Sequence, residues 1–406
     1  MEFALSEQQR TLQQQCRELA LRFSENAAQH DREASAPTEN YAALRDAGLY
    51  GLLIPETFGG LGAGLLGHTI AMEELAQGCA STALSFNMHC VATYTLTAAG
   101  AFSAEICERV SKMVIGEQRL MANLISEAGT TNLLYSTRAS STQASKVDGG
   151  YVINGRKAFA SMMSSADVAL VCVHPAHIDN PESVIMVIVD TNAPGLTIEP
   201  VWDTLGMRAT RSDNVLLEDC FVADAFALDE LIVPSIGEFL STHESLINLP
   251  YTAVYLGVGL AALRAINTVV SERKPKGYDQ PLAYHPDIRR RIGKMSAELE
   301  GSRWALRYAA WVADTEGQTP AAQSAMFKAK YLVGEAVAGA TRSALEMAGA
   351  HGLFKGNDIE RLFRDGATAS IMQPSSDVCL GQISQAELSL DRAEVVPPLR
   401  PSRSGG

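Results

Sequence analysis

The spacing of hydrophobic residues changes twice along this chain, and this limits the fold more than any other feature. Near the start, Ser6 and Gln9 form a capping box. The residues after it recur at helical spacing: Leu12, Cys16, Leu19 and Phe23. Further helical patterns cover Tyr41–Gly48, Ala71–Leu75 and Ala104–Ile115. The front of the chain is therefore predicted to be helical.

From Leu120 the pattern becomes one of short, Val/Ile-rich runs bounded by Gly, Asp, Asn and Pro. These runs are Tyr151–Ile153, Val168–Val173, Val184–Val189 and Asn214–Phe221. Because no helix-length pattern separates them, we expect antiparallel pairing in a sandwich or barrel and not a parallel βαβ sheet. A Rossmann fold is therefore not expected.

Helical spacing returns from about Glu238. One stripe consists of Ile288, Ile292, Met295 and Leu299, and a second of Val333, Val337, Ala340, Ala344 and Met347. The small residues of the second stripe permit close helix contact. We predict an α+β fold with an N-terminal helical domain at 1–119, a middle antiparallel β domain at 120–235 and a C-terminal four-helix bundle at 236–394, followed by a disordered tail at 395–406.

Charge and cysteine content limit the partners and the compartment. The formal net charge is -13 and no Lys/Arg run occurs, so nucleic acid is not an expected partner. The seven cysteines are scattered and never form a C-x-x-C pair, and the N-terminus lacks a signal-peptide pattern, so we predict a cytoplasmic protein. The uncharged stretch Ser245–Leu263 is predicted to be a buried helix, without membrane insertion.

Two motifs suggest chemistry that their surroundings do not support. Gly62, Gly64 and Gly67 spell G-x-G-x-x-G, but a Pro/Gly turn precedes them where a dinucleotide site needs a strand. His174 and His177 flank a proline, and we predict no metal site there. The chain also lacks a G-x-S-x-G elbow and a P-loop, so its chemistry is expected to come from a cofactor.

Several stretches, in order, carry a family resemblance over nearly the whole chain. Residues 55–62 read PETFGGLG and residues 72–75 read MEEL. Together with the motifs below, they resemble the acyl-CoA dehydrogenase superfamily, whose P-E-x-[YF]-G-G-x-G segment also accounts for the glycine motif. The resemblance implies the fold described above and FAD as the cofactor.

The predicted flavin contacts lie in the middle of the chain. Residues 124–129 are similar to the family's first flavin-binding stretch, which implies that Ile125 and Ser126 contact the ring. Downstream of it, Asn132 departs from the family pattern and is assigned to the substrate. Residues 151–161 resemble Y-x-[LI]-N-G-x-K-x-W-I-T, so Phe159 supplies the aromatic wall and Ser161 the hydroxyl near flavin N5. A hydroxyl there can stabilise the charge that hydride transfer brings to the ring.

Further resemblances concern the cofactor phosphates and adenine. Residues 273–277 resemble R-K-x-F-G, which implies that Arg273 pairs with the FAD pyrophosphate of a neighbouring subunit, although Lys276 replaces the aromatic residue. The other residues that the resemblance assigns to the cofactor are Glu346, Gly349, Ala350, Ser375 and Asp377. A homodimer or homotetramer is implied.

The catalytic base is where the chain departs most from the family. Residues 359–365 match the C-terminal signature, but Gln373 occupies the position of the usual glutamate. A neutral amide cannot take the α-proton of a thioester, and a positioned base contributes about 10²–10⁴-fold. Some family members carry the carboxylate earlier, near Ile247, so Glu244 is the candidate base. Asn248 replaces an arginine that often positions substrate, and Asn248 and Gln373 are predicted substrate contacts.

Three functions remain open on this sequence. The first is an FAD-dependent dehydrogenase of an acyl-CoA-like thioester, in which hydride passes to flavin N5 and Glu244 takes the proton. The second is a flavin-dependent monooxygenase on the same fold, motivated by the loss of the usual base at Gln373. The third is a degenerate flavin-binding scaffold, because several cofactor positions have changed.

Overall fold

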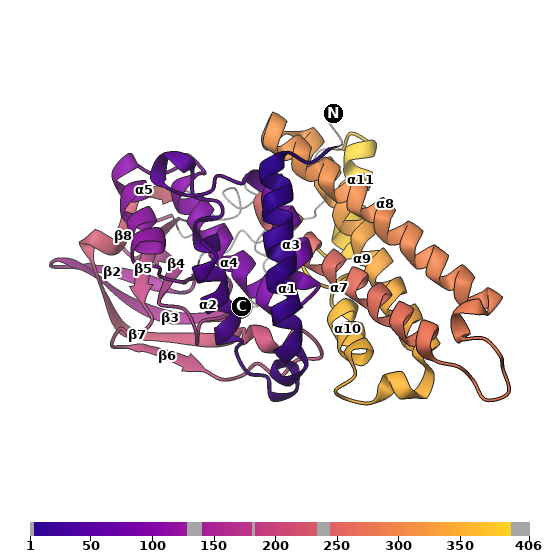
Figure 1. Ribbon diagram of the computed structural model, residues 1–406. Helices are drawn as coiled ribbons and strands as arrows, with labels where there is room; N and C mark the ends of the chain where they lie inside the picture. Colours follow the sequence, from indigo (N-terminus) through magenta and orange to yellow (C-terminus); the bar gives the residue numbers. More distant parts are fainter. Residues whose placement is uncertain (1–3, 128–139, 181–182, 234–243, 391–406) are drawn as a thin grey trace, which may run out of the picture.

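The computed structural model describes residues 4–127, 140–180, 183–233 and 244–390. Helices come first, a β-sheet follows, and long helices return at the end (Figure 1). In Figure 1 the sheet and the C-terminal helices lie on opposite sides, with α1 (Glu7–Glu33) and α3 (Gly64–Ala76) between them. Asn132 and the tail at 395–406 lie outside the described residues.

The front contains helices packed around one apolar core. The predicted capping box is confirmed, since Ser6 Oγ accepts from Gln9 N and Gln9 Oε1 accepts from Ser6 N. The other front helices are α2 (Thr38–Asp46), α4 (Ala80–Thr97) and α5 (Ala104–Ser111), with short helical turns at η1 (Leu49–Gly51), η2 (Glu56–Phe58) and η3 (Lys112–Gly116).

Helix α4 was missed by the sequence reading because it has no polar face. Every residue of α4 except Tyr94 is buried, so its side chains show no helical alternation. The polar groups on α4 bond inside the core: Ser85 lies 2.7 Å from the Tyr41 hydroxyl, and the two ring nitrogens of His89 lie 2.9 and 3.0 Å from Tyr50 O and Met121 N. Because the core surrounds α4 on nearly all sides, its sequence carries no pattern from which a helix could be predicted.

The glycine motif spans a turn and the start of a helix: Gly62 lies before α3, and Gly64 and Gly67 lie within it. Helix α3 begins at Gly64, and η2 precedes it where a nucleotide site would have a strand. The Asp314 carboxylate accepts from Leu65 N at 2.7 Å and Leu66 N at 2.8 Å. A carboxylate from the C-terminal helices thus occupies the helix end that a phosphate would use.

The sheet is mixed, which corrects the expectation of antiparallel pairing throughout. Its order is β6-β7-β3-β2-β4-β5-β8, with β1 added beside β4. Among the described strands, the β1–β4 and β2–β4 pairs are parallel and the rest antiparallel. The connection from β1 to β4 contains β2 and β3, and this length allows the parallel crossover.

The strands of this sheet have the following bounds: β1 (Met121–Leu124), β2 (Gln143–Val147), β3 (Gly150–Ala160), β4 (Val168–Pro175), β5 (Val184–Asp190), β6 (Leu196–Glu199), β7 (Asp213–Ala223) and β8 (Ala227–Val233). Two short turns, η4 (Arg208–Thr210) and η5 (Asp224–Phe226), flank β7.

Long helices form the back of the chain. They are α7 (Glu244–Glu272), α8 (Pro286–Glu316), α9 (Pro320–Ala348), α10 (Asp358–Ala367) and α11 (Ser376–Glu387), with turns η6 (Leu282–Tyr284) and η7 (Gly349–Leu353). Helix α9 packs against α7, α8, α10 and α11. The stripe predicted on α9 is buried, whereas on α8 only Met295 and Leu299 of the predicted stripe are buried and Ile288 and Ile292 are half-buried. Helix α7 is apolar and long enough to cross a membrane, but it lies mostly within the core, as predicted for Ser245–Leu263.

Candidate active site

A pocket of about 420 Å³ lies where the three parts of the chain meet. Its walls come from α4 and α7, the ends of β1 and β3, the segment at 202–212, and the segment at 368–373. Seven predicted site residues line it: Ile125, Ser126, Phe159, Ser161, Glu244, Asn248 and Gln373. The fold therefore brings the predicted flavin residues and both candidate catalytic positions to one cavity.

The wall formed by the end of β3 combines an open aromatic ring with hydroxyls. Phe159 is 63% exposed, has a φ of 56°, and meets Trp202 edge to face at a centroid distance of 6.0 Å. The Ser161 and Ser212 hydroxyls lie 2.8 Å apart, and Ser212 lies 2.8 Å from the Thr210 hydroxyl. A planar ring could stack on Phe159 while Ser161 bonds to its edge.

The facing helix α7 presents one stripe of residues to the pocket: Glu244, Ile247, Asn248, Tyr251 and Tyr255. The last four lie three, four, seven and eleven residues after Glu244, and these separations place all five on one helix face. Glu244 and Asn248 are each 3% exposed, so Glu244 is not a solvated residue at a helix start. A carboxylate on this wall can reach a substrate held in the pocket.

The two tyrosines of this stripe were missed by the sequence reading. The Tyr251 hydroxyl donates to Met88 Sδ at 3.1 Å, and the Tyr255 hydroxyl accepts from Thr368 Oγ1 at 3.2 Å. Burial raises the pKa of both phenols well above their ordinary value, so both are neutral. Their spacing after Asn248 was the signal that could have identified them.

Gln373 lines the pocket, but its side chain is exposed. Thr368 and Met372 lie deeper on the same wall, where they are half-buried. Gln373 is therefore at the edge of the pocket, where its amide can contact a ligand.

A buried ion pair that was not predicted from the sequence joins β3 to the segment after β1 at the pocket wall. Lys157 on β3 is fully buried, and its Nζ lies 2.5 Å from Glu127 Oε1. Ser140, Ser141 and Thr142 also donate to the Glu127 carboxylate. Burial by itself raises the pKa of Glu127, but the Lys157 charge and these hydrogen bonds lower it to about 2. Glu127 is thus a fixed anion and not a base.

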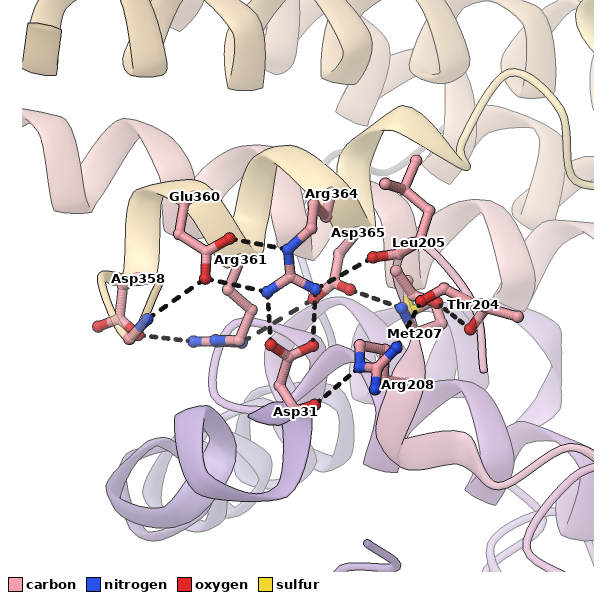
Figure 2. Close-up of polar contacts among 12 residues, drawn as sticks. Asp31, Thr204, Leu205, Met207, Arg208, Asp358, Glu360, Arg361, Arg364 and Asp365 are labelled. Carbon is pink, nitrogen blue, oxygen red and sulfur yellow. Dashed lines mark hydrogen bonds and ion pairs between the residues drawn. The ribbon is translucent and has the colours of Figure 1, made fainter. Parts of the chain in front are cut away.

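Helix α10 holds the opposite wall in place through a cluster of charges (Figure 2). Arg364 Nη1 donates to Leu205 O at 3.0 Å, and Asp365 Oδ1 accepts from Met207 N at 2.7 Å. Arg364 also pairs with Asp31 at the end of α1 at 2.5 Å. Burial raises the pKa of Asp365 to about 6, although Arg361 and the Met207 N–H act in the opposite direction. One helix therefore fixes both sides of the turn at 205–207, which lines the pocket.

We call the bonds from Arg364 and Asp365 to the turn at 205–207 the clamp. A substitution at Gly206 tests whether the clamp stabilises the protein. A Cβ at Gly206 would overlap the Arg364 backbone carbonyl, which cannot rotate away. We expect Gly206→Ala to reduce the free energy of unfolding by about 1–3 kcal/mol, and to weaken ligand binding, because the turn must move. Chemical denaturation measures the first effect, and Gly339→Ala on α9, where a Cβ meets nothing within 4 Å, is the control. Equal stability of the two variants would contradict the clamp.

The remaining predicted cofactor residues lie outside this pocket. Arg273, directly after α7, donates to Ala348 O at 2.9 Å and is exposed, beside Gly349 with its φ of 67°. Glu346 pairs with Arg291 at 2.7 Å and Arg342 at 3.1 Å, and Ala350 is exposed. Ser375 caps α11 by accepting from Val378 N, and Asp377 is exposed in its first turn. One chain does not bring these residues to the flavin wall.

Three family models match the chain in sequence order. The acyl-CoA dehydrogenase N-terminal domain matches residues 6–131, the middle domain 125–220 and the C-terminal domain 250–388. The chain belongs to the acyl-CoA dehydrogenase family. Members of this family are flavoenzymes, and FAD is their typical cofactor. The predicted α+β fold class is thereby confirmed.

Relatives with different substrates are equally similar to this acyl-CoA dehydrogenase family member. Benzylmalonyl-CoA dehydrogenase of Aromatoleum aromaticum is 28% identical over 92% of this chain and 98% of its own length. Cyclohexane-1-carbonyl-CoA dehydrogenase of Syntrophus aciditrophicus is 28% identical over 88% and 90%. The family is thus clear, whereas these matches leave the substrate open.

Solved structures of the same fold include both a dehydrogenase and a monooxygenase. The glutaryl-coenzyme A dehydrogenase complex with glutaryl-CoA has a TM-score of 0.83 and 22% identity, covering 97% of this chain and 98% of the other. FMN-bound TdsC from Paenibacillus sp. A11-2, elsewhere described as a dibenzothiophene monooxygenase, has a TM-score of 0.82 and 23% identity, covering 93% and 97%. At these identities the likeness establishes the fold alone.

Proposed function

We propose that the protein is an FAD-dependent dehydrogenase of an acyl-CoA-like thioester, with Glu244 as the catalytic base. The observation that carries this proposal is the buried Glu244 carboxylate on the same pocket as Phe159 and Ser161. Glu127, the other carboxylate on the pocket, is held as an anion by Lys157 and cannot serve. The site therefore contains one carboxylate suited to take a proton.

The β3 wall fits a flavin. Phe159 offers an exposed ring face, and Ser161 has a hydroxyl oriented by Ser212, so both can hold a planar ring and bond to its edge. Ile125 and Ser126 border the same wall. FAD, when bound there, would accept a hydride from the substrate β-carbon.

The chain's own residues then have distinct tasks. Glu244 removes the α-proton of the thioester, and the apolar side chains around it exclude water. Ser161 stabilises negative charge at the ring edge by donating a hydrogen bond. Gln373 and Asn248 contact the substrate without exchanging protons, and Asn132, outside the described residues, remains assigned to it.

One observation favours a second function, a flavin-dependent monooxygenase. Gln373 stands at the position of the usual base, and the pocket remains large and mostly apolar. In that reaction reduced flavin and O₂ deliver one oxygen atom to the substrate and the other leaves as water, so no thioester α-proton has to be removed. A degenerate flavin-binding scaffold is the third candidate, for which bound FAD would be absent after mild purification.

An anaerobic spectral screen separates these functions. The FAD-loaded protein is mixed with a series of acyl-CoAs without oxygen, and the visible flavin band is followed. The dehydrogenase proposal expects at least one thioester to bleach the band. Absence of bleaching by every thioester, together with an oxygenated product when reduced flavin and O₂ are supplied, would replace it with the monooxygenase.

We also propose a homodimer or homotetramer in which Arg273, with Glu346, Gly349 and Ala350, reaches the FAD pyrophosphate of a neighbouring subunit, and Ser375 and Asp377 contact cofactor from the start of α11. Large apolar side chains exposed on the bundle support association: Trp304, Tyr308, Leu332, Leu380 and Leu388.

The seven free, buried cysteines support a reducing, cytoplasmic location. The domain boundaries at 119 and 235 remain part of this proposal.

Arg273→Ala is expected to weaken FAD retention and subunit association together, because one guanidinium would serve both. FAD content after gel filtration and the molar mass by light scattering measure the two effects. Arg289→Ala, an exposed arginine on α8, is the control. Full FAD retention in Arg273→Ala would remove the pyrophosphate assignment.

A further inference from the structure

Asn248 carries an unused hydrogen-bond donor into the pocket. The residue is 3% exposed in the second turn of α7, and it lines the cavity. Across the described parts of the chain, no acceptor forms a hydrogen bond with Asn248 Nδ2. On β1, another wall of the pocket, the Oδ1 atom of Asn123 is likewise buried without a described donor. Two amides therefore offer polar atoms, unpaired among the described residues, to a mostly apolar pocket.

Such groups are costly unless a ligand completes them. A buried polar group without a partner loses about 1–3 kcal/mol of hydration that nothing in the protein replaces. Most buried polar groups in native proteins are therefore bonded, and an exception that lines a cavity is open to a partner from the cavity, a ligand or an ordered water. A donor fixed in this position favours binding of a ligand that places an oxygen there over one that has only hydrocarbon there.

The charges around the pocket exclude an anionic oxygen. No lysine, arginine or histidine is present among the described residues that line it. The Glu244 carboxylate lies one helical turn before Asn248 and also lines the cavity. A carboxylate or phosphate on the ligand would lose its hydration, meet a like charge and gain no cation in return.

Much of the wall near Asn248 is apolar. Leu84, Met88 and Val91 of α4 lie along one side, and Ile247 of α7 lies beside Asn248. These side chains favour a hydrocarbon or aromatic body for the ligand. The donor at Asn248 thus lies beside apolar side chains within a mostly apolar pocket.

We propose that Asn248 determines the specificity of this pocket by donating a hydrogen bond to an uncharged oxygen, a hydroxyl or a carbonyl, of a mainly apolar substrate group. This inference rests on the proposed function only in taking the pocket as the substrate site, because recognition by Asn248 does not depend on which reaction follows. It names the chemistry of the group bound: neutral, apolar in body and carrying one oxygen acceptor.

Three small aromatic probes of similar shape test the inference without any reaction. Toluene, 4-methylphenol and 4-methylbenzoate differ only in carrying hydrogen, a neutral hydroxyl or a carboxylate opposite the methyl group. Their dissociation constants for the purified, cofactor-loaded protein at neutral pH are measured by calorimetry or ligand-observed NMR. We expect 4-methylphenol to bind about tenfold more tightly than the other two, as one neutral hydrogen bond allows.

Asn248→Leu keeps a side chain of similar size and removes the donor. In this variant we expect the preference for 4-methylphenol over toluene to disappear, while Asn192→Leu, at an exposed position after β5, keeps it. The ranking of the three probes on the unmodified protein stands as evidence even if Asn248→Leu does not fold. Equal or tighter binding of toluene or 4-methylbenzoate, no binding of 4-methylphenol, or an unchanged preference in Asn248→Leu would each overturn the inference. A failed thioester screen would not affect any of these results.

Discussion

Glu244→Gln is expected to lower turnover of the preferred thioester by about 10²–10⁴-fold, which corresponds to roughly 3–5 kcal/mol of transition-state stabilisation. The substitution keeps the shape of the buried side chain and removes its ability to accept the α-proton. Substrate affinity should change little, because the lost interaction forms mainly in the transition state. Single-turnover flavin reduction without oxygen measures the rate, and the concentration dependence measures affinity.

Two further substitutions make this result specific. Glu272→Gln changes an exposed carboxylate at the other end of α7 and should leave the rate unchanged. Gln373→Ala should affect substrate affinity more than the rate of reduction, because an amide has no proton to take from the substrate. If Glu244→Gln reduces its flavin as fast as the unmodified protein with every accepted thioester, Glu244 is not the base.

Lys157→Met is expected to reduce the free energy of unfolding by about 3–5 kcal/mol. Lys157 is fully buried, and its removal leaves the Glu127 carboxylate in the protein interior without its counter-charge. Urea denaturation followed by circular dichroism measures the loss. The double variant Lys157→Met with Glu127→Leu removes both charges, so it should be more stable than Lys157→Met alone. A double variant as unstable as the single one would show that the charge is not the cause.

Acid provides a second measurement on the same pair. The pKa of Glu127 falls from its ordinary value of 4.5 to about 2 in the folded protein. The folded state thus binds fewer protons here than the unfolded state, and the stabilisation is complete above about pH 4.5 and is lost as the pH falls toward 2. Glu127→Gln should flatten this part of the stability profile.

The order of helix, strand and helix followed from the spacing and the type of side chains. Helices with one buried face show helical spacing, and the fully buried strands β4 and β5 were recognised from their Val/Ile-rich composition. Several segments that were missed have no polar face or are short. Helix α4 is buried on nearly all sides, and β1 and β6 are only four residues long. The parallel partner of β1 lies beyond two intervening strands, so no local pattern could reveal it.

The site was predictable where single motifs carry it and not where distant segments meet. Phe159 and Ser161 were identified from one short stretch, and the structure brings them to the pocket with Glu244. The clamp on the turn at 205–207 depends on partners far away in sequence: Met207 N bonds to a carboxylate 158 residues later. The pairing of Glu127 with Lys157 has the same origin, since each residue alone looks like a surface charge.

The cluster drawn in Figure 2 sets the order in which the site can be completed during synthesis. During synthesis Asp31 emerges from the ribosome first and the turn at 205–207 later. Their bonds to Arg364 can form only after that residue has emerged too. A nascent chain that stops before α10 has neither this clamp nor the wall at 368–373. A chain truncated before α10 should therefore fail to retain a flavin even when its sheet has folded.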